Sequence, residues 1–151
     1  MNEVIKINDQ LVKEAHFEYG GRDCIVVFQY EGFRCGYVSL KKSEEVFREY
    51  EILGERRKEI DYGAFNVSCH GGLTYGGGLI QELSPTAEWY VGFDCSHFCD
   101  GNDFKTAKFY GLKPYPLSWF NKPNGIVLSL EQCIQECKSI ADQLNKQLEE
   151  K

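Results

Sequence analysis

The chain has 151 residues, of which 42% are hydrophobic and 14% aromatic, which excludes a disordered protein and predicts one domain over residues 1–151. Its formal net charge of −6 at pH 7 disfavours a protein that follows the phosphate backbone of a nucleic-acid polymer. No run of about 18 apolar residues is present, and the first segment, MNEVIKINDQ, lacks the apolar core of a signal peptide. We therefore expect a cytoplasmic protein without a membrane partner.

Residues 14–40 are predicted to form a three-stranded antiparallel meander. The runs Cys24–Tyr30 and Phe33–Leu40 are rich in β-branched and aromatic residues, and a short glycine-containing link separates them, as in a β-hairpin. Before them, apolar and polar side chains alternate over residues 14–19, and the chain then turns at Gly20-Gly21. This alternation is typical of a strand with one buried face.

A change of period predicts a short helix after these first strands, over residues 43–53. Ser43 is a suitable N-cap, and apolar side chains then recur at helical spacing, at Val46, Phe47, Tyr50 and Leu53. Gly54 is expected to end the helix. The charged residues that follow, GERRKE, are expected to form an exposed link.

The pattern then returns to strands, which are predicted at Ala64–His70, Leu73–Gly77 and Glu88–Cys95. In the last of these strands, alternate side chains are predicted to face the core. The opposite face is predicted to carry Tyr90, Gly92 and Asp94. Residues 101–128 hold three of the four prolines and are expected to form a long irregular loop.

The C-terminal segment predicts an amphipathic helix of about five turns. Ser129 and Gln132 form a capping box, and apolar residues follow at helical spacing: Leu130, Cys133, Ile134, Cys137, Ile140, Ala141, Leu144 and Leu148. Strands followed by a closing helix predict an α+β fold, with an antiparallel sheet, a short helix after the first strands and this long helix.

Two histidines mark the candidate site. His70 and His97 each stand at the end of a predicted strand, and Asp94 and Asp100 flank His97. If the strands are neighbours, two imidazoles and two carboxylates meet at one mouth, a set suited to proton transfer. The alternative is that each histidine forms structural hydrogen bonds with the backbone of a turn.

The residues around these histidines favour a nucleotide-derived ligand. Glycines such as Gly71 and Gly72 permit close approach of the backbone to an anion. Aromatic residues such as Tyr75 can stack on a base. The candidate partners of phosphate are Arg22, Arg34, Arg56 and Arg57, although a solvated charge run also explains Arg56 and Arg57. The predicted ligand-binding residues are His70, Gly71, Gly72, Tyr75, Asp94, His97 and Asp100.

The seven cysteines point to reduced thiols, because their number is odd and no export signal precedes them. Cys95, His97 and Cys99 could contribute to a zinc site, but their spacing is not that of a common zinc motif, and core packing already explains Cys95. Cys69 precedes His70, and adjacent strand residues point to opposite faces, which disfavours a cysteine nucleophile. We predict no metal and no cofactor.

The motifs CGYV, HGGLTY and GFDCSH, followed by the closing amphipathic helix, resemble a family of small, mostly uncharacterised proteins encoded by phages and prophages. The matching segments are Cys35–Val38, His70–Tyr75, Trp89–Asp100 and Glu136–Leu144. The resemblance implies a cytoplasmic protein of an infected host that counters bacterial defence, by analogy rather than from the residues.

Three functions remain open at this stage. The first is a homo-oligomeric binding module that sequesters an immune signalling nucleotide. The second is a metal-independent phosphodiesterase in which His70 and His97 act as base and acid, with Asp94 or Asp100 orienting one imidazole. The third is a protein–protein interaction module that inhibits a host enzyme.

Overall fold

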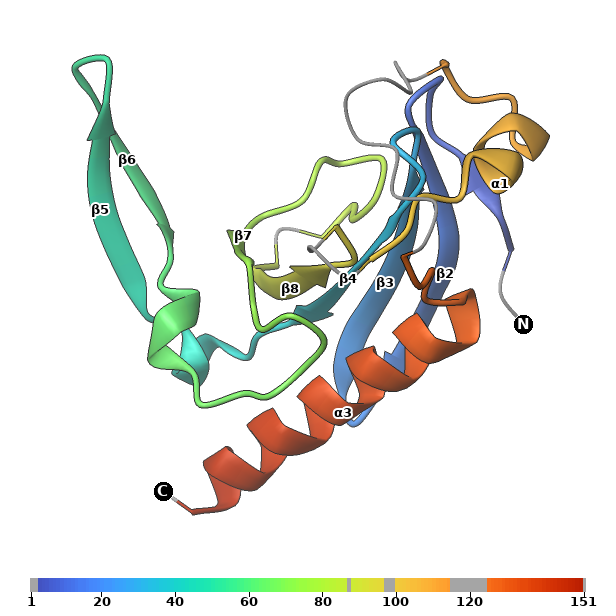
Figure 1. Cartoon of the computed structure of the whole chain (residues 1–151). Coiled ribbons are helices and arrows are strands. Elements are labelled where there is room, and N and C mark those ends of the chain that lie inside the picture. The colour runs from blue at the N-terminus through green and yellow to red at the C-terminus, as the bar shows by residue number, and fades with distance from the viewer. Residues whose placement is uncertain (1–2, 87, 97–99, 115–124, 151) are drawn as a thin grey trace.

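A computed structural model describes residues 3–86, 88–96, 100–114 and 125–150 of the chain. Its main element is an antiparallel sheet of six strands in the order β1-β2-β3-β4-β8-β7 (Figure 1). The predicted meander is confirmed, and the turn between its first two strands has positive φ at both Gly20 and Gly21, as a two-residue hairpin turn requires. The strands are β1 (Ile5–Lys6), β2 (Leu11–Tyr19), β3 (Arg22–Gln29), β4 (Arg34–Ser39), β7 (Tyr75–Gly77) and β8 (Tyr90–Asp94).

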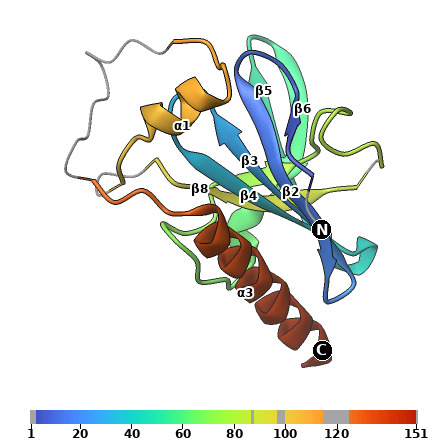
Figure 2. The same ribbon diagram turned by 90° about the vertical axis from the view of Figure 1, so that its right-hand side faces the viewer.

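The long helix α3 (Leu130–Glu149) packs across one face of this sheet, which confirms the predicted α+β fold (Figures 1 and 2). The Ser129–Gln132 capping box is formed, and the predicted apolar stripe lies against β2, β3 and β4. Gly36 on β4 allows this close approach, because a Cβ there would lie 2.4 Å from the Phe93 ring and 2.9 Å from Cys137 Sγ. The fully buried part of the stripe consists of Cys133, Cys137, Ile140, Ala141 and Leu144.

The opposite face of the sheet is also covered. Leu79 and Leu83, from the segment between β7 and β8, pack there against Ile25, Val27 and Tyr90. Tyr90, which we expected on the face away from the core, is fully buried. The sheet therefore has a core on each side, and strand alternation separates two buried faces rather than one buried and one exposed face.

The predicted helix over residues 43–53 is wrong. Lys42–Glu44 form a single 3-10 turn (η1), and β5 (Phe47–Ile52) pairs with β6 (Glu55–Ile60), the segment that we expected to be an exposed link. The helical spacing of the apolar residues is coincidental, because the pairing places opposite charges across the strands and Leu53-Gly54 supply the two-residue turn. This hairpin stands away from the main sheet (Figure 1).

Two further expectations need correction. Residues 65–70 form no strand but follow the 3-10 turn η2 (Tyr62–Ala64), because side chains of α3 take the place of a strand partner. Gln143 bonds to both the N–H and the C=O of Ser68, and Gln147 donates to the C=O of Asn66. The expected loop over 101–128 contains a helix, α1 (Phe104–Phe109), which the side chain of Asp103 caps. Residues 115–124 of that loop lie outside the described part of the chain.

Two of the four arginines expected as partners of phosphate, Arg22 and Arg34, are instead buried in ion pairs, whereas Arg56 and Arg57 lie exposed on β6. Arg22 binds Glu44 through two nitrogens, at 2.6 and 2.7 Å, and Arg34 binds Glu14 likewise, at 2.6 and 3.2 Å. Glu14 is the extra residue of a β-bulge in β2, between Lys13 and Ala15. Both guanidinium groups thus stabilise the fold and are not available to a ligand.

Replacement of Glu14 by Gln should lower the free energy of unfolding by about 3–5 kcal/mol, because it leaves the buried Arg34 guanidinium without its counter-charge. Urea denaturation followed by circular dichroism measures the change. Glu18→Gln, at an exposed position on the same strand, is the control and should change stability by about 0.5 kcal/mol or less. Equal stabilities of the two variants would contradict a structural role for the pair.

Candidate functional site

His70 and Asp100 are brought together as predicted, although His70 lies in a turn rather than at the end of a strand. Its Nε2 lies 2.8 and 3.0 Å from the two carboxylate oxygens of Asp100. The imidazole side chain is 27% exposed and the carboxylate side chain 4% exposed. Gly71 and Gly72 follow with positive φ, which lets the chain reverse tightly behind the histidine. A buried carboxylate that orients a half-exposed imidazole is an arrangement suited to proton transfer.

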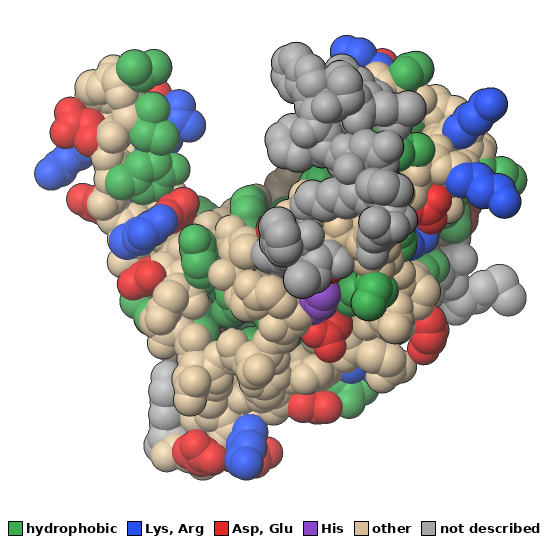
Figure 3. All heavy atoms as spheres, in the orientation of Figure 1, with side chains coloured by type: hydrophobic (Ala, Val, Ile, Leu, Met, Phe, Trp, Pro, Cys, Tyr) green, Lys and Arg blue, Asp and Glu red, His purple; other side chains and the backbone are tan. Residues whose placement is uncertain are grey.

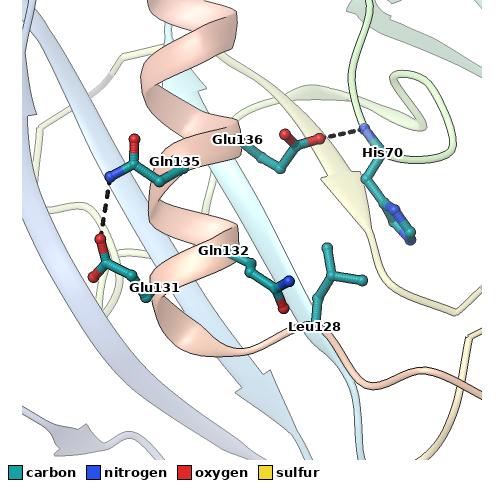
Figure 4. A pocket seen from close by; sticks show the side chains of 6 residues that line it. All are labelled: His70, Leu128, Glu131, Gln132, Gln135 and Glu136. Carbon is teal, nitrogen blue, oxygen red and sulfur yellow. Dashed lines mark hydrogen bonds between the residues drawn. The ribbon is translucent and has the colours of Figure 1, made fainter.

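The His70 depression, of about 400 Å³, lies beside the first turns of α3. In Figure 4 the His70 ring faces Leu128 and Gln132, and Glu136 accepts a hydrogen bond of 2.6 Å from the backbone N–H of His70. Glu131 and Glu136 line the depression, and among the residues that the structure describes there is no Lys or Arg in this lining. This surrounding charge opposes the binding of phosphate. The depression is lined by His70, Leu128, Glu131, Gln132, Gln135 and Glu136.

Asp94 and Tyr75 lie in a different depression, of about 380 Å³, at the β4–β8–β7 end of the sheet. Thr74 donates a hydrogen bond of 2.8 Å to Asp94, and the rings of Tyr37 and Tyr75 meet edge to face with centroids 5.3 Å apart. Burial raises the pKa of both phenols, so both are neutral near pH 7. We call this the Tyr37–Asp94 depression; its lining is Gln29, Phe33, Cys35, Tyr37, Thr74, Tyr75, Phe93, Asp94 and Ser96.

The residues that we expected around one mouth therefore lie in two separate depressions. The two depressions share no lining residue: His70 lies beside the first turns of α3, whereas Asp94 of β8 bonds to Thr74 and lies among residues of β4 and β7. Of the predicted residues, His70, Gly71, Gly72 and Asp100 lie together, and Tyr75 lies with Asp94. His97 lies outside the described residues.

A third polar cluster, which the sequence analysis did not identify, lies around His16. His16 Nε2 is 2.7 Å from Asp23 Oδ1, and Tyr90 donates a hydrogen bond of 2.7 Å to Asp23 Oδ2. Lys13 Nζ lies 3.2 Å from His16 Nδ1. An ammonium group only donates, so Nδ1 accepts and the proton of neutral His16 sits on Nε2, toward Asp23. The depression beside it, of about 310 Å³, is also lined by Glu18 and Glu88.

The sequence did contain a signal for part of this cluster. The two-residue turn at Gly20-Gly21 sets Glu18 opposite Asp23, which places His16 and Asp23 diagonally on the same face of the hairpin. The same register does not predict that Lys13 belongs to this cluster. In a regular strand Lys13 and His16 would lie on opposite faces, and only the bulge at Glu14 brings them to the same face.

The cysteines carry no metal site within the described residues, where no group of three or more His, Cys, Asp or Glu side chains could hold an ion. Cys95 is buried in the core, with its sulfur 3.8 Å from Cys133 Sγ, as the core-packing interpretation predicts. The hydrogen bond with Cys133 and burial raise the pKa of Cys95. His97 and Cys99, the other candidate zinc ligands, lie outside the described residues.

Comparisons with protein-family models, with curated proteins and with solved structures gave no significant match to this chain. Among the described helices, none has both the length and the apolar character needed to cross a membrane.

Cys69 should be a poor nucleophile near neutral pH, because burial raises its pKa to about 11. Its thiolate fraction at pH 8 should be about a hundredfold lower than that of a thiol with an ordinary pKa of 9.0. Alkylation by iodoacetamide, followed at the Cys69 peptide by mass spectrometry, should remain slow at pH 8 and accelerate toward pH 11. Rapid alkylation at pH 7 would contradict this and reopen thiol chemistry beside His70.

Proposed function

We propose that the protein binds a small nucleotide-derived ligand, with the nucleoside part in the Tyr37–Asp94 depression. One observation carries the proposal: aromatic rings, a carboxylate, an amide and hydroxyl groups converge there on a space of about 380 Å³. Such a combination is typical of pockets for small planar ligands. Tyr37 and Tyr75 offer π-surfaces to a base, and Asp94 and Gln29 offer hydrogen bonds to a base edge or a ribose hydroxyl.

The lining also defines how such a ligand would lie. None of the described lining residues is Lys or Arg, and Arg22 and Arg34 are engaged with Glu44 and Glu14. Phosphate groups would therefore point toward solvent, away from Asp94. A ligand held by its base and ribose would be bound rather than transformed, because the described lining residues include no histidine that could act as acid or base.

This mode of binding is consistent with sequestration. The resemblance to small phage-encoded proteins adds the biological setting, in which a binder removes a signalling nucleotide from the cytoplasm of an infected host. In this proposal the protein acts as a homo-oligomer and needs neither a metal nor a cofactor. It would lower the concentration of free signal without cleaving it.

The replacement Asp94→Asn tests the binding site. The purified protein is incubated with a panel of cyclic nucleotides and ADP-ribose derivatives, free ligand is removed, and the released compound is identified by mass. We expect intact ligand from the wild type, and affinity at least about tenfold weaker for Asp94→Asn, because hydrogen bonds to a charged group contribute about 1.5–3 kcal/mol. Asp142→Asn, at an exposed carboxylate on α3, is the matched control and should bind normally.

Hydrolysis of the same ligand class is the second candidate, favoured by the contact of 2.8 Å between His70 and Asp100. In this mechanism His70 takes a proton from the attacking water, whose oxygen forms a new bond to phosphorus. The P–O bond to the leaving group breaks, and His97 protonates the leaving oxygen. We place it second because Glu131 and Glu136 line the His70 depression and oppose a phosphodiester there.

If the protein is an enzyme, His70→Ala and His97→Ala should each lower turnover about 10²–10⁴-fold while the protein remains folded. The measurement is the rate of product formation by mass spectrometry under single-turnover conditions. His16→Ala removes a histidine from the other polar cluster and should leave the rate unchanged. Full activity of both His70 and His97 variants would eliminate this mechanism.

A further inference from the structure

Three strands, β4, β7 and β8, build an aromatic surface in the Tyr37–Asp94 depression. Tyr37 of β4 and Tyr75 of β7 both pair with Gly92, from opposite sides of β8. Gly92 has no side chain to separate them, and a Cβ there would lie 2.6 Å from Tyr37 Cδ1. The two rings therefore meet beside Gly92, edge to face, with centroids 5.3 Å apart. Together they offer a surface on which a flat ring system can stack.

Asp94 lies next to this aromatic surface. It follows Gly92 by two residues on β8, so the two positions share a face of the sheet and are about 6.6–6.8 Å apart. The hydroxyl of Thr74 donates to Asp94 Oδ2 at 2.8 Å, and the backbone N–H of Ser96 donates to Oδ1 at 3.0 Å. These two hydrogen bonds fix the orientation of the carboxylate. A base stacked on the rings would thus present one edge to a carboxylate of defined geometry.

An ionised carboxylate restricts which base edge can face it. It accepts hydrogen bonds and cannot donate them, and each of its oxygens can accept more than one. Guanine presents two adjacent donors on its Watson–Crick edge, N1–H and N2–H. Adenine and cytosine each present one amino donor beside a ring-nitrogen acceptor, and uracil presents its N3–H between two carbonyl oxygens. An acceptor next to the carboxylate is repelled, so guanine is the common base that matches this group best.

The charge of the depression favours contact with the base edge over contact with the ribose. The described lining residues include no Lys or Arg. The basic side chains of the β5–β6 hairpin and those beside α1 stand at opposite ends of the face shown in Figure 3. A carboxylate bound to the ribose hydroxyls would have phosphate close by, whereas N1 and N2 of guanine lie on the side of the base away from the sugar. Recognition of that edge therefore keeps the negative charges apart.

We propose that the ligand of the Tyr37–Asp94 depression is a guanine nucleotide. Its base stacks on Tyr37 and Tyr75, and Asp94 accepts hydrogen bonds from N1–H and N2–H. This inference rests on the proposed function, because it specifies the base of the nucleotide that binds there. Asp94 is then the residue that determines specificity, and Thr74 is a residue that positions it.

Three cyclic nucleotides that differ only in the base test the assignment: cyclic GMP, cyclic IMP and cyclic AMP. The base of cyclic IMP keeps N1–H but lacks the N2 amine, so its dissociation constant should be about tenfold larger than that of cyclic GMP. Cyclic AMP turns an acceptor toward the carboxylate and should bind at least as weakly as cyclic IMP. Equilibrium dialysis of the wild-type protein against each compound measures the constants without any substitution that could affect folding.

Asp94→Asn adds a measurement that a merely structural role of Asp94 would not change. An amide offers one acceptor and one donor, so one of the two guanine donors loses its partner. The ratio of the cyclic IMP constant to the cyclic GMP constant should then fall from about tenfold to about twofold or less. General damage to the depression would weaken both ligands and keep the ratio. Asp142→Asn, at an exposed carboxylate on α3, is the control and should also keep it.

The possible failures point to different errors. Equal affinity of the wild type for all three compounds, or a preference for cyclic AMP, would overturn the assignment of guanine and leave nucleotide binding in place. A ratio that survives Asp94→Asn would overturn the role of Asp94. Retention of no compound among the cyclic nucleotides and ADP-ribose derivatives would overturn the proposed function, and this inference with it.

Discussion

The ion pair between Glu14 and Arg34 is the contact on which the surroundings of the candidate sites depend. It forms because Glu14, at the bulge in β2, and Arg34 of β4 both lie on the α1 and α3 side of the sheet, within reach of each other. Tyr110, at the end of α1, donates to the same carboxylate, and Arg34 donates to the C=O of Leu128 just before α3. One buried charge pair thus joins two strands, α1 and the start of α3, and removal of either partner leaves a charge in a medium that solvates it poorly.

Helix α3 supports the candidate site in a second way. Its glutamine and glutamate side chains bind the backbone of residues 66–70, which has no strand partner, and the last of these bonds, from Glu136, fixes His70. The histidine is therefore positioned by the core helix and by the buried Asp100. Backbone groups need partners, and here side chains supply them. A turn held in this way can keep an imidazole at the surface without a regular strand beneath it.

The separation of polar groups between the two faces of the sheet limits what each depression can bind. Carboxylates lie near His70, and aromatic rings line the same depression as Asp94. Two lysines line the cavity beside α1. A chain with a net charge of −6 has few uncommitted cationic side chains near its concave surfaces, because both well-placed arginines neutralise buried carboxylates. This distribution leaves aromatic rings and the Asp94 carboxylate at one depression and two lysines, Lys108 and Lys113, beside α1.

The sequence by itself determined the elements whose signals are local. These are the glycine turn and alternation of the β2–β3 hairpin, the capping box and stripe of α3, and the α+β class. It also placed His70 with Asp100. Tertiary structure decided the rest. The β5–β6 hairpin has apolar residues at helical spacing but forms strands. Cross-strand pairing and the contact of Phe47 with Trp89 outweigh a weak helical preference. Burial of Arg22 and Arg34, the bulge at Glu14 and the division of the predicted site depend on long-range contacts, which no local pattern encodes.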